Sequence, residues 1–400
     1  MSARAFRGAG APSSRLPRAV AVMAAAAGLV GANIHYSQPL LPMIALSLSV
    51  DPALAGWLPA VTQLGFAIGL LLLLPLADSL DRKRLILVTV AVAGGALLAQ
   101  SLAPTLPLVL VAALVVGVAS IAPQILSPFA ATIAPAGREG QASGMVLSGI
   151  LLGVLLSKVL AGVLGAVVGW RWIYGGAAVV MVVLLVVLWR ALPELPPGLP
   201  QRFREILASP LVLLRAHGTL RLHSAIGFVV SAAFMLFWSS YALQLYDQFG
   251  FGSLVAGLFG LAGIAGSLLA PLAGRGVDEG RVRANLVLAG TLIAAGFLLM
   301  WVGQASVVAL VVAILVLDAG VGVAHSSNQA RVFRVDPLKR SRLNSVYMFS
   351  DFMGGAVGSL VGVAAYGAFA WAGVCVAGLA TGVVILGVVA GNRKALAAAV

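Results

Sequence analysis

The chain has very little charge. Asp, Glu, Lys and Arg together make up 9% of its 400 residues, whereas a soluble domain carries about 25%. Hydrophobic residues make up 61%, and the mean hydropathy is +1.07. These values exclude an ordinary soluble domain and predict a protein embedded in a lipid bilayer.

Several chemical motifs are also absent. The single cysteine, Cys375, excludes an intramolecular disulfide, and no Cys/His cluster has metal-ligand spacing. The sequence contains no Ser/His/Asp hydrolase signature and no Walker-type phosphate loop. We therefore expect neither an enzyme nor a metal site, and no cofactor, with a proton gradient in place of ATP as the energy source.

The sequence does contain a series of long apolar segments. A bilayer core about 30 Å thick requires about 20 apolar residues per helix. We predict twelve spans, at residues 18–47, 53–77, 85–103, 106–132, 142–167, 171–191, 222–246, 252–274, 284–303, 306–334, 343–368 and 371–391. The predicted fold is an all-α integral membrane protein of two six-helix bundles, 18–190 and 222–391, with a connector at 191–221 and tails at 1–17 and 392–400.

The basic residues predict the orientation of these spans. The net charge is +13, and all basic residues except Lys158 and Arg171 lie at the termini or around the loops that follow even-numbered spans. Positive residues near span ends stay in the cytoplasm. We therefore expect both termini and the connector in the cytoplasm of a bacterial-type inner membrane. The same distribution explains the basic balance without a nucleic-acid partner.

A charged hinge occurs twice, half a chain apart. Leu76–Asp78 and Arg82–Arg84 lie between the second and third spans, and a shift of 200 residues places Asp78 on Asp278. Such a duplication predicts parallel repeats related by a pseudo-two-fold axis along the membrane normal. The charges of the hinge can form a gate, with contacts that exist in one conformational state and break in the other. Alternatively, they are solvated charges that only set the membrane topology. The predicted cytoplasmic gate comprises Asp78, Arg82, Lys83, Asp278, Arg281 and Asp351.

Small residues recur every fourth position along the fifth span. They are Gly149, Gly153, Ser157, Ala161, Gly165 and Gly169. A face of small residues lets two helix backbones approach closely. A shift of about 201 residues places Gly153 on Gly354 of the eleventh span, so we expect close packing in both halves.

With these motifs, the chain resembles the major facilitator superfamily over essentially its whole length. Residues 74–83, LPLADSLDRK, are similar to the family hinge Gly-x-Leu-Ala-Asp-x-x-Gly-Arg-Lys, with Leu74 and Asp81 in place of its glycines. Residues 33–42 resemble the sugar- or drug-efflux-like branch of drug–proton antiporters. Ala113 departs from the arginine that many of those antiporters carry. The resemblance implies a monomeric transporter that works by alternating access on a small-molecule substrate.

Ionisable side chains within the spans are candidates for proton coupling, because each is costly at bilayer depth. Asp318, His325 and Gln329 share one face of the tenth span, at offsets of seven and four. A buried ion pair or a neutral carboxyl is the alternative for Asp318, and a packing histidine for His325. Lys158 either reaches the outer headgroups or faces the cavity and pairs with an acid such as Asp318. His35 completes the candidates.

Polar and aromatic residues of the first and seventh spans predict the substrate cavity. Pro39 frees a backbone carbonyl next to a polar run, and the seventh span carries a matching cluster. Packing alone is the alternative for the aromatic residues. The predicted cavity residues are Asn33, Tyr36, Gln38, Gln124, Trp238, Tyr241, Gln244 and Gln329.

These residues favour proton-coupled efflux of a small organic compound such as a drug, sugar or metabolite. A symporter or uniporter that imports a metabolite is one alternative, because nothing in the sequence sets the direction. A membrane sensor that binds a ligand without transporting it is another, although a static receptor needs no pair of gates.

Overall fold

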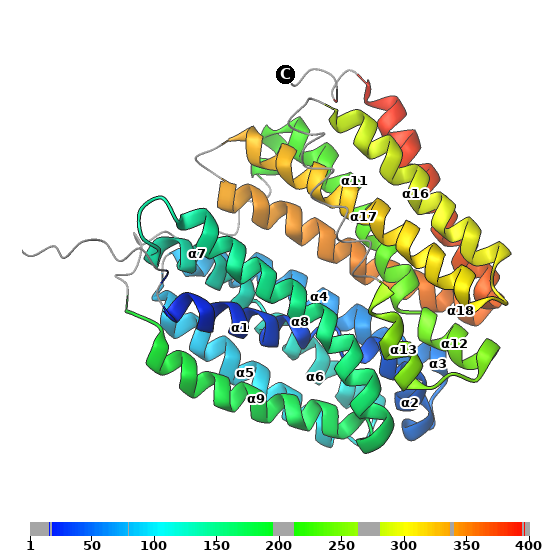
Figure 1. The fold of residues 1–400 in the computed structure, drawn as a ribbon, viewed down its shortest axis with the longest axis horizontal. Coiled ribbons are helices and arrows are strands. Elements are labelled where there is room, and N and C mark those ends of the chain that lie inside the picture. The colour runs from blue at the N-terminus through cyan, green and yellow to red at the C-terminus, as the bar shows by residue number, and fades with distance from the viewer. Residues whose placement is uncertain are drawn as a thin grey trace, which may run out of the picture.

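The computed structural model describes Leu16, residues 18–78, 80–194, 212–262, 281–336 and 340–393, and Leu396. Within these residues the regular structure is helical, with no strand. The helices run in two groups that follow the chain order, one from the N-terminal half and one from the C-terminal half (Figure 1). The predicted all-α fold is confirmed.

The N-terminal group contains nine α-helices and one 3-10 helix. They are α1 (Arg18–Ala32), α2 (Ser37–Leu48), α3 (Pro52–Ala55), α4 (Trp57–Leu72), η1 (Pro75–Asp78), α5 (Arg82–Leu102), α6 (Leu106–Ala119), α7 (Ala122–Ile133), α8 (Glu139–Val168) and α9 (Trp170–Ala191).

The helices described in the C-terminal group are longer on average. They are α11 (Gly218–Trp238), α12 (Tyr241–Phe249), α13 (Ser253–Phe259), α16 (Val282–Val302), α17 (Val307–Val335) and α18 (Arg340–Gly391).

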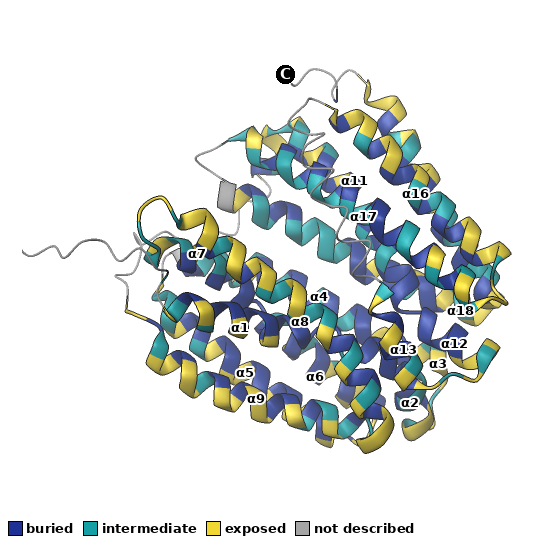
Figure 2. Ribbon diagram, viewed as in Figure 1, coloured by how far each residue is buried: buried dark blue, intermediate teal, exposed yellow. Residues whose placement is uncertain are grey.

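Ten described segments are long and apolar enough to cross a membrane. The last of them, α18, has non-helical backbone at Phe369 and Ala370, so it contains two of the predicted spans. The predicted eighth span, 252–274, lies partly outside the described residues. Large apolar side chains such as Leu151 of α8 and Val183 of α9 are exposed, as a surface that faces lipid requires (Figure 2).

Three predicted spans are broken near their middle. The first breaks between α1 and α2, at Asn33–Tyr36. Pro39 cannot donate a hydrogen bond to the carbonyl of His35, and its ring would clash there in a continuous helix. Pro123 acts in the same way between α6 and α7, where the sequence predicted a continuous span.

The seventh span breaks at Ser239 and Ser240, without a proline. Ser239 Oγ donates to the carbonyl of Met235 over 2.7 Å, and Ser240 Oγ donates to that of Leu236 over 3.0 Å. Hydroxyls that bond to the carbonyl four residues earlier compete with the helical hydrogen bonds and bend the helix. The breaks in the first and seventh spans place polar residues of the two halves at similar depths.

The small residues pack as the repeat predicts. A Cβ atom at Gly153 of α8 would collide with the backbone of Gly28 in α1, and one at Gly354 of α18 would collide with that of Phe228 in α11. The first and fifth spans of each half therefore touch through their backbones. Gly117, the position aligned with Asp318, lies so close to the carbonyl of Thr62 in α4 that no side chain fits there.

The two bundles contact each other through short helices and through parts of the longer helices α4, α8 and α18. Helix α2 contacts α12 and α13, helix α8 contacts α13, and helices α3 and α4 contact α18. The short helices α2, α3, α12 and α13 lie together in Figure 1. We call the end where α5 begins at Arg82 and α9 ends at Ala191 the basic end. The end where the four short helices lie is the opposite end.

Candidate functional site

A lysine of one bundle lies against a tryptophan of the other. Lys158 of α8 is 4% exposed, and its Nζ atom lies 3.1 Å from the ring centroid of Trp238 at the end of α11. The same atom lies 5.5 Å from the ring of Phe234. A desolvated ammonium on the face of an indole is a cation–π contact. Lys158 is therefore buried between the two bundles and does not extend to the outer headgroups.

Asp318 of α17 is the acid whose charge acts on Lys158. It is 5% exposed, and its Oδ1 atom has no hydrogen-bond partner. Asp318 and Lys158 interact electrostatically without forming a salt bridge within 4 Å. The indole of Trp238 also interacts with this carboxyl, although its Nε1 atom makes no hydrogen bond of normal geometry. Opposite charges from the two bundles thus converge on one aromatic ring.

The break in the first span adds polar groups to the same region. His35 is 6% exposed and interacts with the charge of Lys158. Gln38 Nε2 lies 3.5 Å from His35 Nδ1 and 3.6 Å from the sulfur of Met235 in α11. Gln63 of α4 donates to the same sulfur over 3.6 Å. Sulfur is a weak acceptor, so these contacts between the bundles are easily exchanged.

Two more buried acceptors in this region are unsatisfied. They are Asn33 Oδ1 and Gln38 Oε1, and both side chains are nearly inaccessible to solvent. Buried polar atoms without partners are uncommon and require an explanation, such as a site that a ligand completes. We call the set His35, Gln38, Lys158, Trp238 and Asp318 the central site. Asn33 belongs to the same helix break, but its Nδ2 atom lies 3.5 Å from the sulfur of Met181 in α9, within the N-terminal bundle.

Tyr36, Tyr241 and Gln244 lie near the central site, but two of them are held by protein contacts. Tyr36 packs edge-on against Tyr174 within the N-terminal bundle. Tyr241 donates to the carbonyl of Ala256 over 3.0 Å. Gln244 is 5% exposed and lines two pockets. Tyr241 lines one of these pockets as well.

A second polar group lies toward the basic end, within the C-terminal bundle. His325 Nδ1 lies 3.3 Å from the Tyr347 hydroxyl and 3.8 Å from Asp351 Oδ1. Buried His223 of α11 pairs with Asn328 Oδ1 over 2.7 Å. We call these five residues the basic-end cluster. The helix rise separates His325 from Asp318 by about 10 Å, and the contacts of His325 are with residues of α18.

The two remaining predicted cavity residues are half-buried. Gln329 is half-buried and donates to Asn344 of α18 over 3.4 Å. Gln124 is half-buried near the start of α7.

Two predicted gate residues, Arg82 and Lys83, make contacts within the N-terminal half of the chain. Arg82 donates to the carbonyl of Ala77 and to Thr132, and Lys83 lies 3.8 Å from Glu194. Arg281 directly precedes α16. Asp278 lies outside the described residues, as does the side chain of Asp78.

Sequence reasoning missed some of these contacts. Asp81, interpreted as a substituted glycine, is the N-cap of α5 and accepts from the backbone N–H groups of Lys83 and Arg84. An acid directly before a helical run is a recognisable cap signal. Gln63 and Met235 gave no comparable signal, because an uncharged residue within an apolar span is unremarkable by itself.

Comparison with known proteins identifies the class. Residues 21–359 match the Major Facilitator Superfamily model. The chain therefore belongs to the major facilitator superfamily.

Its relatives are named as transporters. The "Uncharacterized transporter YgaY" of Escherichia coli O157:H7 is 37% identical over 363 residues, which cover 90% of this chain and 92% of that protein. The "Probable transporter SCO4007" of Streptomyces coelicolor is 34% identical over 88% of this chain and 83% of its own length. A "Probable sugar efflux transporter" of Helicobacter pylori strain G27 is 26% identical over 58% of this chain and 59% of that protein.

Solved structures share the fold at low identity. The nucleoside transporter NupG superposes with a TM-score of 0.77 at 13% identity, over 94% of this chain and 99% of that one. A bacterial homolog of the human lysosomal transporter Spinster, in an inward-facing conformation, gives 0.72 at 15%, over 95% and 96%. The chain is thus a multi-pass membrane transporter of a small substrate and not an enzyme, and its bacterial relatives place it in the plasma membrane.

Proposed function

We propose that this transporter exports a small hydroxylated organic compound in exchange for protons. In this proposal Asp318 is the protonation site, and Lys158 is its charge partner in the other bundle. The observation that carries the proposal is the meeting of Lys158 and Asp318 at Trp238, buried between the two bundles. The transporter would act as a monomer in the bacterial plasma membrane, with both termini in the cytoplasm.

The charge pair links protonation to the position of the bundles. An ionised Asp318 attracts Lys158 and favours the arrangement in which the two bundles approach each other at this depth. A proton on Asp318 removes that attraction. A difference of about 1.4 kcal/mol changes the ratio of two conformations tenfold, so the loss of a modest electrostatic attraction is enough to drive the change.

The unsatisfied acceptors favour a substrate with hydroxyl groups. Gln38 Oε1 and Asp318 Oδ1 are buried oxygens without donors, and substrate hydroxyls would supply the donors. Protonation turns one Asp318 oxygen from an acceptor into a donor. Substrate and proton therefore compete at Asp318, and such competition is the requirement for exchange. The relative named as a probable sugar efflux transporter agrees with this chemistry.

Proteoliposomes test the proposal. The purified full chain is reconstituted with a pH-sensitive dye inside, and gradients of neutral sugars and polyols are imposed in turn. We expect at least one of them to drive proton movement in the direction opposite to its own. Asp318→Asn is expected to abolish this proton flux, while Glu194→Gln, an exposed carboxylate with 84% of its side chain accessible, leaves it unchanged.

Two results would contradict the proposal. Proton flux of normal size in Asp318→Asn would remove Asp318 from the mechanism. Movement of the proton and the sugar in the same direction would make the protein a symporter, and sugar flux without proton movement would make it a uniporter.

A further inference from the structure

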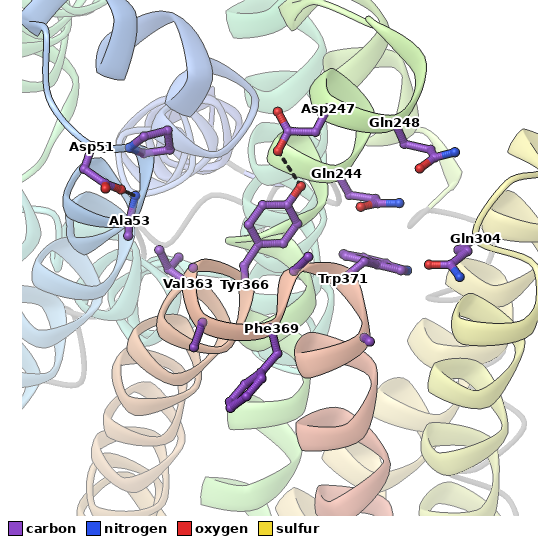
Figure 3. Close-up of a pocket in the computed structure, with 15 residues that line it drawn as sticks. Asp51, Ala53, Gln244, Asp247, Gln248, Gln304, Val363, Tyr366, Phe369 and Trp371 are labelled. Atoms are coloured by element: carbon purple, nitrogen blue, oxygen red, sulfur yellow. Dashed lines mark hydrogen bonds between the residues drawn. The ribbon is translucent and has the colours of Figure 1, made fainter.

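A pocket of about 700 Å³ opens at the opposite end, away from the basic loops. Both bundles line it. Asp51, Pro52 and Ala53 come from the N-terminal bundle, and α12, Gln304 and the kinked part of α18 supply the rest (Figure 3). The pocket lies at the opposite end, whereas the central site lies deeper between the two bundles.

The mouth of this pocket carries two acids and no base. Asp51 and Asp247 are exposed at its rim, and no Lys or Arg is among the lining residues. Neither carboxylate forms a salt bridge within the described part of the chain. Asp51 accepts a hydrogen bond from the backbone N–H of Ala53 over 2.7 Å, and Asp247 accepts one from the Tyr366 hydroxyl over 2.7 Å. These bonds fix both carboxylates in place and leave their charge uncompensated.

The floor of the pocket is aromatic and contains an unpartnered amide. Trp371 is 3% exposed, with its indole N–H committed to the carbonyl of Met300. Gln244 is 95% buried, because its exposed fraction is 5%, and its side chain makes no hydrogen bond within the described residues. In Figure 3 its amide lies above Trp371 and to the right of Tyr366. A buried amide that faces a pocket without a partner marks a place where a ligand completes the hydrogen bonds.

The same two floor residues connect this pocket to the interior. Gln244 and Trp371 also line a small cavity with Phe237 and Tyr241, the aromatic neighbours of Trp238. A molecule bound in the pocket therefore lies on the route between the opposite end and the central site.

We propose that this pocket is a binding site for small organic amines with an aromatic or other apolar body. The ammonium group would lie between Asp51 and Asp247, and the body would pack on Tyr366 and Trp371, with the Gln244 amide available to a polar substituent. Cations are attracted both to carboxylates and to aromatic ring faces. Because the two acids belong to different bundles, a bound amine also bridges the bundles and favours the state in which the opposite end is closed.

Isothermal titration of the full chain in lipid nanodiscs tests the site, with empty nanodiscs as the reference for partition into lipid. The probes are phenethylamine, phenethyl alcohol and phenylacetate, which share a body and differ in charge. We expect saturable binding of the amine that weakens as NaCl is raised, weaker binding of the alcohol, and none of the acid.

Matched variants locate the binding. Asp51→Asn keeps a capping side chain, and Asp247→Asn keeps an acceptor for Tyr366, so both are expected to fold. Each should weaken amine binding about tenfold, as the loss of one charge-assisted hydrogen bond implies, and Gln244→Ala should weaken it as well. Asp318→Asn and Glu194→Gln should leave it unchanged. A thermal melt of each variant confirms folding.

The outcomes separate this site from the proposed transport mechanism. Equal binding of amine and alcohol, or unchanged amine binding in the Asp51→Asn/Asp247→Asn double variant, would overturn the proposal. So would saturable binding of Ca²⁺ alone. Binding is measured without any gradient, so failure of proton exchange leaves this result standing, and the reverse is also true.

Discussion

The central site and the basic-end cluster contain similar residue types, but they differ in how many of their buried polar atoms have hydrogen-bond partners. In the central site, Lys158 and Asp318 belong to different bundles, and several buried atoms have no hydrogen-bond partner. In the basic-end cluster, His325 contacts Tyr347 and Asp351 of the same bundle, and His223 contacts Asn328. Asn328 Nδ2 is the one unsatisfied atom of that cluster in the described structure.

The difference distinguishes two uses of buried polarity. A satisfied network within one rigid bundle stabilises that bundle and stays unchanged as the bundles move. Incomplete contacts between two bundles change whenever the bundles move or a ligand enters. The central site is therefore where we expect function, and the basic-end cluster is where we expect stability. The predictions below test this distinction.

The largest effect is expected at Asp318. Asp318→Asn removes the titratable group and keeps the size of the side chain, so proton-coupled flux should fall about a hundredfold or more, while uncoupled binding of the substrate persists. Flux in proteoliposomes and substrate binding in nanodiscs measure the two quantities separately. Equal loss of both would show that the residue serves binding and not coupling.

A double variant tests whether Lys158 and Asp318 act on each other. Removing one of two buried opposite charges typically costs about 3–5 kcal/mol, whereas removing both is often close to neutral. Lys158→Met alone should therefore destabilise the protein by about 3 kcal/mol, and Lys158→Met/Asp318→Asn should recover most of that loss without recovering transport. Unfolding in mixed detergent–SDS micelles measures the stabilities. Additive losses would mean that the two charges are independent.

Trp238→Phe separates packing from function at the central site. The substitution weakens the cation–π contact with Lys158, typically worth about 0.5–2 kcal/mol, and also removes an indole N–H that has no hydrogen bond. These effects oppose each other, so we expect a change in stability within about 1 kcal/mol and a clear fall in flux. Phe249→Leu, also an aromatic substitution in the C-terminal bundle, serves as the control. A stability loss above about 3 kcal/mol, typical of a large core truncation, would mark Trp238 as a packing residue.

The sequence was sufficient for the fold and for two of the buried charges, but it did not identify buried His223 or Arg331. Asp318 and Lys158 were identified because ionisable residues are costly in apolar spans, and the duplicated hinge and glycine faces predicted the repeat. The sequence offered the Lys158–Asp318 pair as one of two arrangements but could not select it, because 160 residues separate the two positions and helix rotation about the bundle axis is set by packing across many residues. The shared helix face suggested that His325 would join Asp318, yet Tyr347 and Asp351 of α18 hold it elsewhere.

Gly117 shows a limit of reasoning from the repeat. The shift of about 201 residues aligns Gly117 with Asp318, and from the sequence alone this difference suggests substrate contacts in one bundle and proton coupling in the other. The structure gives a packing reason for glycine, because the backbone of α4 at Thr62 leaves no space for a side chain. An asymmetry between aligned positions can therefore arise from local helix contacts before any functional difference exists.

The smallest effect is expected at the basic-end cluster. His325→Gln removes the contacts with Tyr347 and Asp351 but retains a polar side chain, so the free energy of unfolding should fall by about 1–2 kcal/mol, the cost of one or two buried hydrogen bonds. Proton-coupled flux per folded molecule should be unchanged, because the cluster lies within one bundle and moves as a unit. Tyr347→Phe, which removes a single hydroxyl, should lower stability by less and likewise leave flux unchanged. A loss of coupling in His325→Gln at normal stability would instead make His325 part of the proton route, and the distinction between the two polar groups would then fail.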